Sequence, residues 1–144
     1  MLAGLTLGHG RGHIARAIVE ASALAIRHVA EPMLEAGVRV TEMRVCGGPA
    51  RSRFWNQVKA DVTGFRVVVP AVLETAVLGS AILGAVGIGL HADLPAAIRV
   101  MTRIESRIEP RAELAPRYDR LFEAYKGLYP ATSSVLRPLT AVLA

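Results

Sequence analysis

One strand–turn–helix–strand segment constrains the fold of this chain more than any other part of it. Thr41–Cys46 predicts a short strand, which runs into two glycines and a proline. The helix that follows has Ser52 as its N-cap and Gly64 at its end. The β-branched run Arg66–Val69 predicts a second, buried strand. Together they form a βαβ unit, which should be parallel and right-handed, and they put the chain in the α/β class.

Helices are predicted on both sides of this unit. The first, from about His13 to Ala36, has an apolar stripe and two i,i+4 ion pairs on its other side. The stripe consists of Ile14, Ile18, Ala21, Ala25 and Val29, and the pairs are Arg16/Glu20 and Arg27/Glu31. The later segments are an apolar helix from Glu74, a helix over Leu94–Met101, an extended linker over Ile104–Pro110, a helix containing Tyr118 to Leu128, and a tail, Ser133–Ala144, that is weakly helical or loose.

Composition excludes several classes of protein. A chain of 144 residues with 52% hydrophobic residues forms one domain with a real core, so disorder is excluded. The single cysteine, Cys46, excludes a disulfide scaffold and fits a reducing compartment. No signal peptide is evident, so we expect a cytoplasmic protein.

Neither nucleic acid nor a membrane is an expected partner. The net charge of +5 comes almost wholly from scattered arginines, and aromatic residues make up only 5% of the chain. The uncharged stretch Thr75–Leu90 is shorter than the roughly 20 residues that cross a bilayer. We therefore predict that it is a small-residue helix buried in a globular core.

No complete catalytic or metal site is apparent. His9 and His13 are four residues apart, but no further ligand follows at a matching spacing, so a capping or loop-fixing role is predicted for them. Cys46 has no histidine placed to activate it and is expected to be a buried small hydrophobe. Asp61 is expected to be a solvated carboxylate near a helix end.

The best candidate for binding is the segment Arg44–Lys59. Its two glycines let a ligand approach the backbone, and the helix N-terminus behind them favours an anion. Arg51 and Arg53 add donors suited to a phosphate or a planar base. The P-loop and GxGxxG patterns are both absent. From the residues alone, a nucleotide site and a plain connecting turn both remain open.

Four motifs, in order, resemble the FGGY family of carbohydrate kinases. They are GLTLGHGRGHIARAIVE (4–20), RVCGGPARSRFWNQVKADVTGFRVVVP (44–70), ETAVLGSAILGAVGIGL (74–90) and YDRLFEAYKGLY (118–129). The first is similar to the family's second signature, the second to its adenosine motif, and the third to the helix that closes the nucleotide site. Within the family, the sequences of these motifs most resemble those of the xylulokinases.

The resemblance implies an actin-like fold of two ribonuclease-H-like domains, with ATP and Mg²⁺ in the cleft between them. Residues 1–130 would be part of the C-terminal domain, with a short parallel sheet packed by helices, and 131–144 a tail. Gly47, Gly48 and Ala50 would line the adenosine and the α-phosphate, with Ser52 beside the base. Glu74 and Gly79 would lie on the helix behind that pocket. Pro49 stands where the family commonly has glycine.

The resemblance also implies what this stretch lacks. In the family the sugar site, the aspartate base and most of the magnesium site belong to the N-terminal half. We therefore expect the chain to contain no catalytic residue and to phosphorylate a sugar or polyol only together with that half. Apolar surfaces left bare would then favour a homo-oligomer. The alternatives are a non-catalytic remnant acting as an oligomerisation or regulatory module, and a small membrane-associated protein using Thr75–Leu90.

Overall fold

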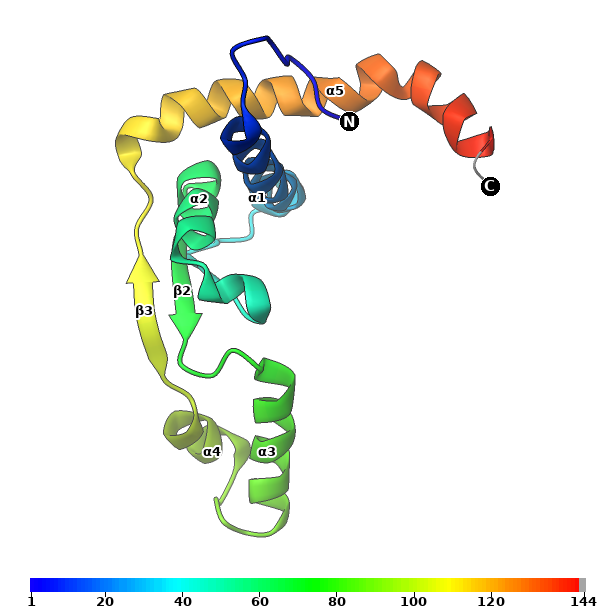
Figure 1. Cartoon of the computed structure of the whole chain (residues 1–144). Helices are drawn as coiled ribbons and strands as arrows, with labels where there is room; N and C mark the ends of the chain where they lie inside the picture. Colours follow the sequence, from blue (N-terminus) through cyan, green and yellow to red (C-terminus); the bar gives the residue numbers. More distant parts are fainter. Residues whose placement is uncertain (143–144) are drawn as a thin grey trace.

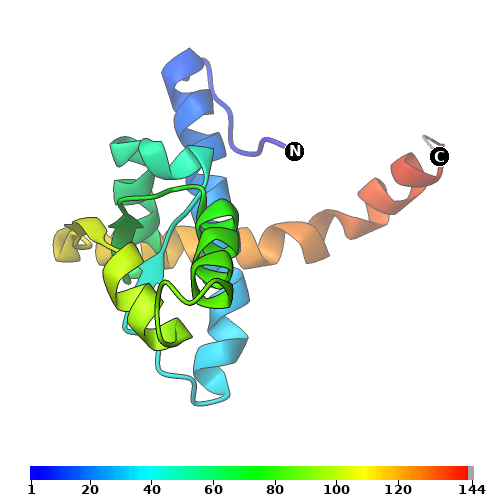
Figure 2. The same ribbon diagram turned by 90° about the horizontal axis from the view of Figure 1, so that it is seen from below.

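The computed structural model describes the backbone of residues 1–142 and the side chains as far as Pro138. It is helix-rich and has one three-stranded sheet (Figures 1 and 2). The elements are α1 (Arg11–Glu35), β1 (Glu42–Arg44), the 3₁₀ turn η1 (Gly48–Arg51), α2 (Arg53–Thr63), β2 (Arg66–Pro70), α3 (Thr75–Gly87), α4 (Leu94–Met101), β3 (Ile104–Ile108), the 3₁₀ turn η2 (Ala112–Leu114) and α5 (Ala115–Val142). The last two residues of the predicted tail lie outside the described residues.

The predicted βαβ unit is confirmed. β1 pairs with β2 in parallel, with Glu42 opposite Arg66. Between them, α2 begins at the cap Ser52 and ends at Gly64, which has a left-handed φ of 73°. Because a residue with a side chain rarely adopts that φ, glycine is what allows the chain to turn directly from helix into strand.

The third strand was not predicted. Residues Ile104–Ile108, expected to be a linker, pair antiparallel with β2, so the sheet is mixed rather than parallel. Three of its five residues are exposed, since it is an edge strand covered on one side only. Its polar sequence therefore lacks the β-branched run that identifies a buried strand.

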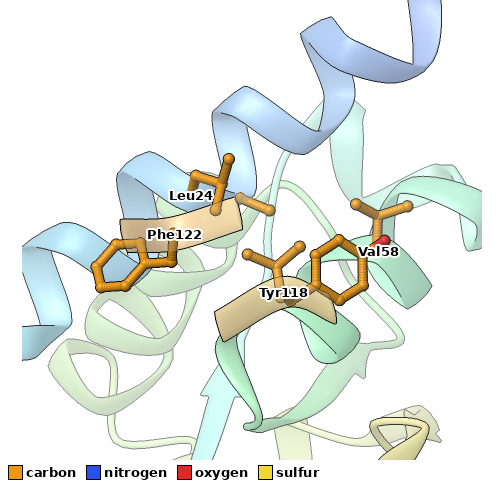
Figure 3. Close-up of a cluster of buried hydrophobic side chains, with 6 residues drawn as sticks. Leu24, Val58, Tyr118 and Phe122 are labelled. Atoms are coloured by element: carbon orange, nitrogen blue, oxygen red, sulfur yellow. The ribbon is translucent and has the colours of Figure 1, made fainter. Parts of the chain in front are cut away.

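The main core lies where α1, α2 and the first half of α5 meet (Figure 3). Its members include Leu24 of α1, Val58 of α2, and Tyr118 and Phe122 of α5. A second cluster is formed by the sheet, η1 and α2 and includes Val45, Ala50, Ala60, Val67 and Val69. In Figure 1, α5 crosses one end of the molecule, while α3 and α4 lie at the other end, beyond β2.

Two expectations about buried faces were wrong. On α1 the apolar stripe is not the packed face: the side chains of Ile18 and Val29 are 59% and 70% exposed, whereas Glu20, Ala23 and Leu24 are buried. Glu20 can be buried because Arg16 and the hydroxyl of Tyr118 both donate hydrogen bonds to its carboxylate.

The second error concerns α3, which is not enclosed in the core. Val77 and Leu83 are 69% and 63% exposed, and within α3 only Ile82 and Ala85 are buried. The helix packs chiefly on α4, which covers one side of it. None of the helices in residues 1–142 combines the length and the apolar character needed to cross a bilayer.

Candidate functional site

The candidate site is built around the glycine turn that follows β1, defined here as the GG turn, Gly47–Ser52. Gly47 has φ 73° and ψ −171°, a combination that is almost exclusive to glycine. Its N–H donates to the carbonyl of Leu73 at 2.9 Å, which ties the turn to the segment leading into α3. Gly48 is exposed, and a Cβ added to it would meet no atom within 4 Å. The turn thus presents open backbone at the carboxyl end of a parallel strand.

Contacts with α2 hold the GG turn in place. Ala50 is buried against the sheet, and its carbonyl accepts a 2.7 Å hydrogen bond from Nδ2 of Asn56. The hydroxyl of Ser52 caps α2 by accepting from the N–H of Trp55 at 3.2 Å. Pro49 lies in the first turn of η1, where a missing N–H costs nothing. These contacts make the turn a fixed shape.

The two remaining predicted residues lie on α3. Glu74 is the N-cap residue of the helix, and its Oε1 is 3.9 Å from Nη2 of Arg51 in the GG turn. Gly79 lines a cavity of about 330 Å³ between α3, α4 and the end of β1, together with Val45 and Cys46. The structure therefore brings all seven predicted residues to the carboxyl end of β1, with Gly79 beside the GG turn rather than in it.

Cys46 is exposed, so the expectation of a buried thiol was wrong. It is the last residue before the GG turn, where the backbone leaves the sheet and turns outward. Lys59 was not predicted as a residue of this region; it is buried on α2, with its Nζ 3.4 Å from Oδ1 of Asn56. Burial lowers the pKa of Lys59, and the charge of Cys46 opposes that shift. No sequence signal distinguishes this lysine from a surface one.

The expectation that Asp61 is solvated was also wrong. Its side chain is fully buried, and it accepts hydrogen bonds from Nη2 of Arg111 at 2.6 Å and from the Arg111 N–H at 2.9 Å. Gln57 donates a further bond at 2.9 Å. Burial alone would raise the pKa of this carboxyl, but the hydrogen bonds from Arg111 and Gln57 outweigh it and lower the pKa. Asp61 is thus a structural tie between α2 and the segment after β3.

The histidines have the loop-fixing role that was predicted. Nδ1 of His9 accepts from the N–H of Thr6, and Nδ1 of His13 accepts from the N–H of Gly10. Within the described residues no three His, Cys, Asp or Glu side chains converge as metal ligands. The donors present at the GG turn suit an adenosine and a phosphate, which need open backbone and N–H groups. They do not form a magnesium site.

Comparison with known proteins shows the family to which the chain is similar. The model of the FGGY family of carbohydrate kinases, C-terminal domain, matches residues 1–88. An FGGY carbohydrate kinase domain-containing protein of Danio rerio is 35% identical over 113 residues, which are 78% of this chain and 21% of that protein. A glycerol kinase of Koribacter versatilis is 39% identical over 109 residues, 75% of this chain and 22% of that protein.

Solved structures agree as well. A xylulose kinase from Rhodospirillum rubrum superposes with a TM-score of 0.80 at 31% identity, over 94% of this chain and 28% of that one. The fold is therefore that of the actin-like ATPases to which the sugar kinases belong. The chain spans only 21% to 28% of the length of these relatives.

Proposed function

Because the chain belongs to the FGGY family of carbohydrate kinases, as a relative of their C-terminal domain, we propose that it supplies the adenosine-binding part of an ATP-dependent sugar or polyol kinase. The observation that carries the proposal is the GG turn: Gly47 has a backbone conformation open to glycine alone, and Gly48 faces open space. The positive φ requires glycine at position 47, whereas no neighbouring atom requires it at position 48, so the proposal assigns Gly48 to contact with the ligand.

Each residue of the site has a distinct task in this proposal. Gly48 lets the nucleoside and its first phosphate lie against the backbone, where a side chain would block them. Ser52 and Ala50 hold the turn on α2, and Ser52 lies beside the base. Glu74 lies 3.9 Å from the guanidinium of Arg51 in an exposed pair, and Gly79 adds no side chain to the α3 wall of its cavity. All of this is positioning, the main protein contribution to phosphoryl transfer.

The acceptor site and the general base belong, in this proposal, to a part of the kinase outside residues 1–144. The bound nucleotide supplies the phosphoryl group, and magnesium is held mainly by that other part, since the GG turn offers no cluster of carboxylates. We place the enzyme in the cytoplasm. By itself the chain binds nucleotide and does not phosphorylate a sugar.

A calorimetric titration with ATP and Mg²⁺ tests the nucleotide site. We expect binding by the chain and at least a tenfold loss of affinity in Gly48→Trp. Gly127→Trp is the matched control, since Gly127 is an exposed glycine in α5, with open space around it and away from the turn. Equal affinities in the two variants would contradict adenosine binding at the GG turn.

A chimera tests the catalytic half of the proposal. The chain replaces the equivalent segment of the Rhodospirillum rubrum xylulose kinase, and sugar-dependent ATP turnover is measured. We expect turnover by the chimera and none by the isolated chain, because the acceptor site is elsewhere. A folded chimera without turnover, whose ATP binding is also lost, would favour the alternative of a non-catalytic oligomerisation module. The exposed apolar side chains of α3 are the observation that supports that alternative.

A further inference from the structure

We propose that a second cavity, lined in part by Ala50 and Arg51 of the GG turn, is a binding site for a phosphate group. This arginine cavity has a volume of about 480 Å³ and lies between η1, the first turn of α2 and β3. It shares no lining residue with the cavity beside Gly79. Its volume is in the range of small-molecule sites. The proposal does not depend on nucleotide binding by the GG turn.

Three arginines from different elements line the arginine cavity: Arg51 of η1, Arg53 of α2 and Arg107 of β3. Arg51 lies near Glu74, whereas neither Arg53 nor Arg107 forms an ion pair with any carboxylate in the described part of the chain. Cations gathered around a hollow focus positive potential into it. Guanidinium groups also match the geometry of a phosphate, which accepts two hydrogen bonds from each.

A β-bulge shapes the outer wall. The register of β3 on β2 passes from Ser106 opposite Val69 to Ile104 opposite Pro70, which leaves Glu105 without a partner position. Successive residues of a regular strand face opposite sides, yet Glu105 and Ser106, on either side of this shift, both line the arginine cavity. A bulge redirects side chains in this way, and bulges are frequent next to binding sites.

The lining chemistry selects a small phosphate over a long polyanion. Ser106 offers a hydroxyl donor, and the first turn of α2 contains no acidic residue that would compete for its N–H groups. Glu105 is the one acidic residue of the lining, and it limits the total negative charge the cavity accepts. The proposed ligand is a free phosphate ion or a small phosphate ester, and not the phosphates of a nucleotide bound at the GG turn.

The test is a titration of the folded chain with inorganic phosphate at low ionic strength. Arg53→Gln/Arg107→Gln is expected to weaken binding at least tenfold. The matched control, Arg99→Gln/Arg120→Gln, removes the same charge from two exposed arginines that do not line the cavity and is expected to change affinity less than twofold. Equal weakening in both doubles would mean general charge attraction and would overturn the proposal. Arg107→Gln alone, on an exposed edge-strand side chain, provides the same comparison if the double variant does not fold.

Amide chemical shifts locate the ion. We expect phosphate to shift the amide signals of Asn56, Ser106 and Arg107 and to leave those of Gly48 and Thr75 unchanged. ADP is the second arm: if it shifts the Gly48 signal without displacing phosphate, the two sites are separate. Displacement of phosphate by ADP would make the arginine cavity part of a nucleotide site and would overturn the proposal, as would the absence of phosphate binding.

Discussion

At the scale of single residues, buried charge decides how the helices are joined. Glu20 on α1 is reached by Arg16 and by Tyr118 of α5, and Asp61 on α2 is reached by Arg111 after β3. A buried carboxylate is costly unless it is hydrogen-bonded, so each of these residues specifies which element must lie against it. The two carboxylates thus fix the relative positions of segments that are about 50 and 100 residues apart in the chain.

Asp61→Asn is predicted to lower the free energy of unfolding by about 2 kcal/mol at neutral pH, since it removes charge-assisted hydrogen bonds from a buried group. The folded-state pKa of Asp61 lies below its unfolded value. Its contribution is therefore complete above about pH 4 and is lost as the pH falls through the folded pKa. Urea denaturation at several pH values should show the variant and the native chain converging only in acid.

The control for this prediction is Asp119→Asn. Asp119 pairs with Arg27 at 2.6 Å, but its side chain is 60% exposed, so the loss should stay below about 1 kcal/mol. Equal losses in the two variants would show that burial of Asp61 contributes nothing.

Replacing the two glycines of the GG turn with alanine is predicted to have different effects on stability. Gly47→Ala should cost about 2 kcal/mol of stability, because its backbone conformation is strained for any residue with a side chain. Gly48→Ala should leave stability within about 0.5 kcal/mol, because the added methyl meets no atom. Thermal melts of the two variants measure this difference. A reversed order would mean that the turn has another shape.

Local chemistry explains which site residues could be predicted. Ser52 and Gly64 were correct because a cap and a helix end depend on neighbouring backbone alone. The solvent exposure of Cys46 and the burial of Asp61 were predicted wrongly, and the burial of Lys59 was not predicted. The segments that surround these residues are distant in the sequence, so the neighbouring residues do not indicate whether they are buried.

At the scale of elements, the two halves of α5 behave differently. The first half packs into the core through Tyr118 and Phe122 (Figure 3). The second half continues past the body of the molecule (Figures 1 and 2), and Tyr129 and Val135 on it are largely exposed. The first half therefore holds the helix to the core.

Phe122→Ala is predicted to cost about 3 kcal/mol of stability, since it removes a large buried ring from the main core. Tyr129→Ala, on the second half of the same helix, should cost less than about 0.5 kcal/mol. Chemical denaturation of both variants gives the comparison. A large loss in Tyr129→Ala would show that the second half of α5 is packed in solution.

Helices and strands could be predicted where the local sequence determines them. The side of a helix that becomes buried could not be predicted in this way. The βαβ unit and the positions of α1, α4 and α5 follow from caps, glycines and periodicity. The face that α1 buries was predicted wrongly, because Arg16 and Glu20 find a partner in Tyr118, about 100 residues further along. The predicted Arg27/Glu31 pair is also absent, because both residues pair with distant residues of α5: Arg27 with Asp119, and Glu31 with Lys126.

At the scale of the whole molecule, the open feature is the apolar surface at the α3 and α4 end. A chain with 52% hydrophobic residues leaves Val77, Leu83, Ile88 and Val100 more than 60% exposed. Exposed apolar patches of this kind mark interaction surfaces. In the proposed function they face the rest of the kinase, and in the isolated chain they are bare.

The last prediction is that the isolated chain associates with itself as its concentration rises, through this surface. Val77→Lys/Leu83→Lys should shift the association to at least tenfold higher concentration, because it removes exposed apolar area and adds charge at no cost to the core. Ser80→Lys/Ala81→Lys adds the same charge to exposed positions of α3 while removing almost no apolar area, so it should shift the association much less. Sedimentation velocity over a range of concentrations distinguishes the variants. A native chain that stays monomeric throughout would contradict association through α3, and equal shifts in the two variants would assign it to charge alone.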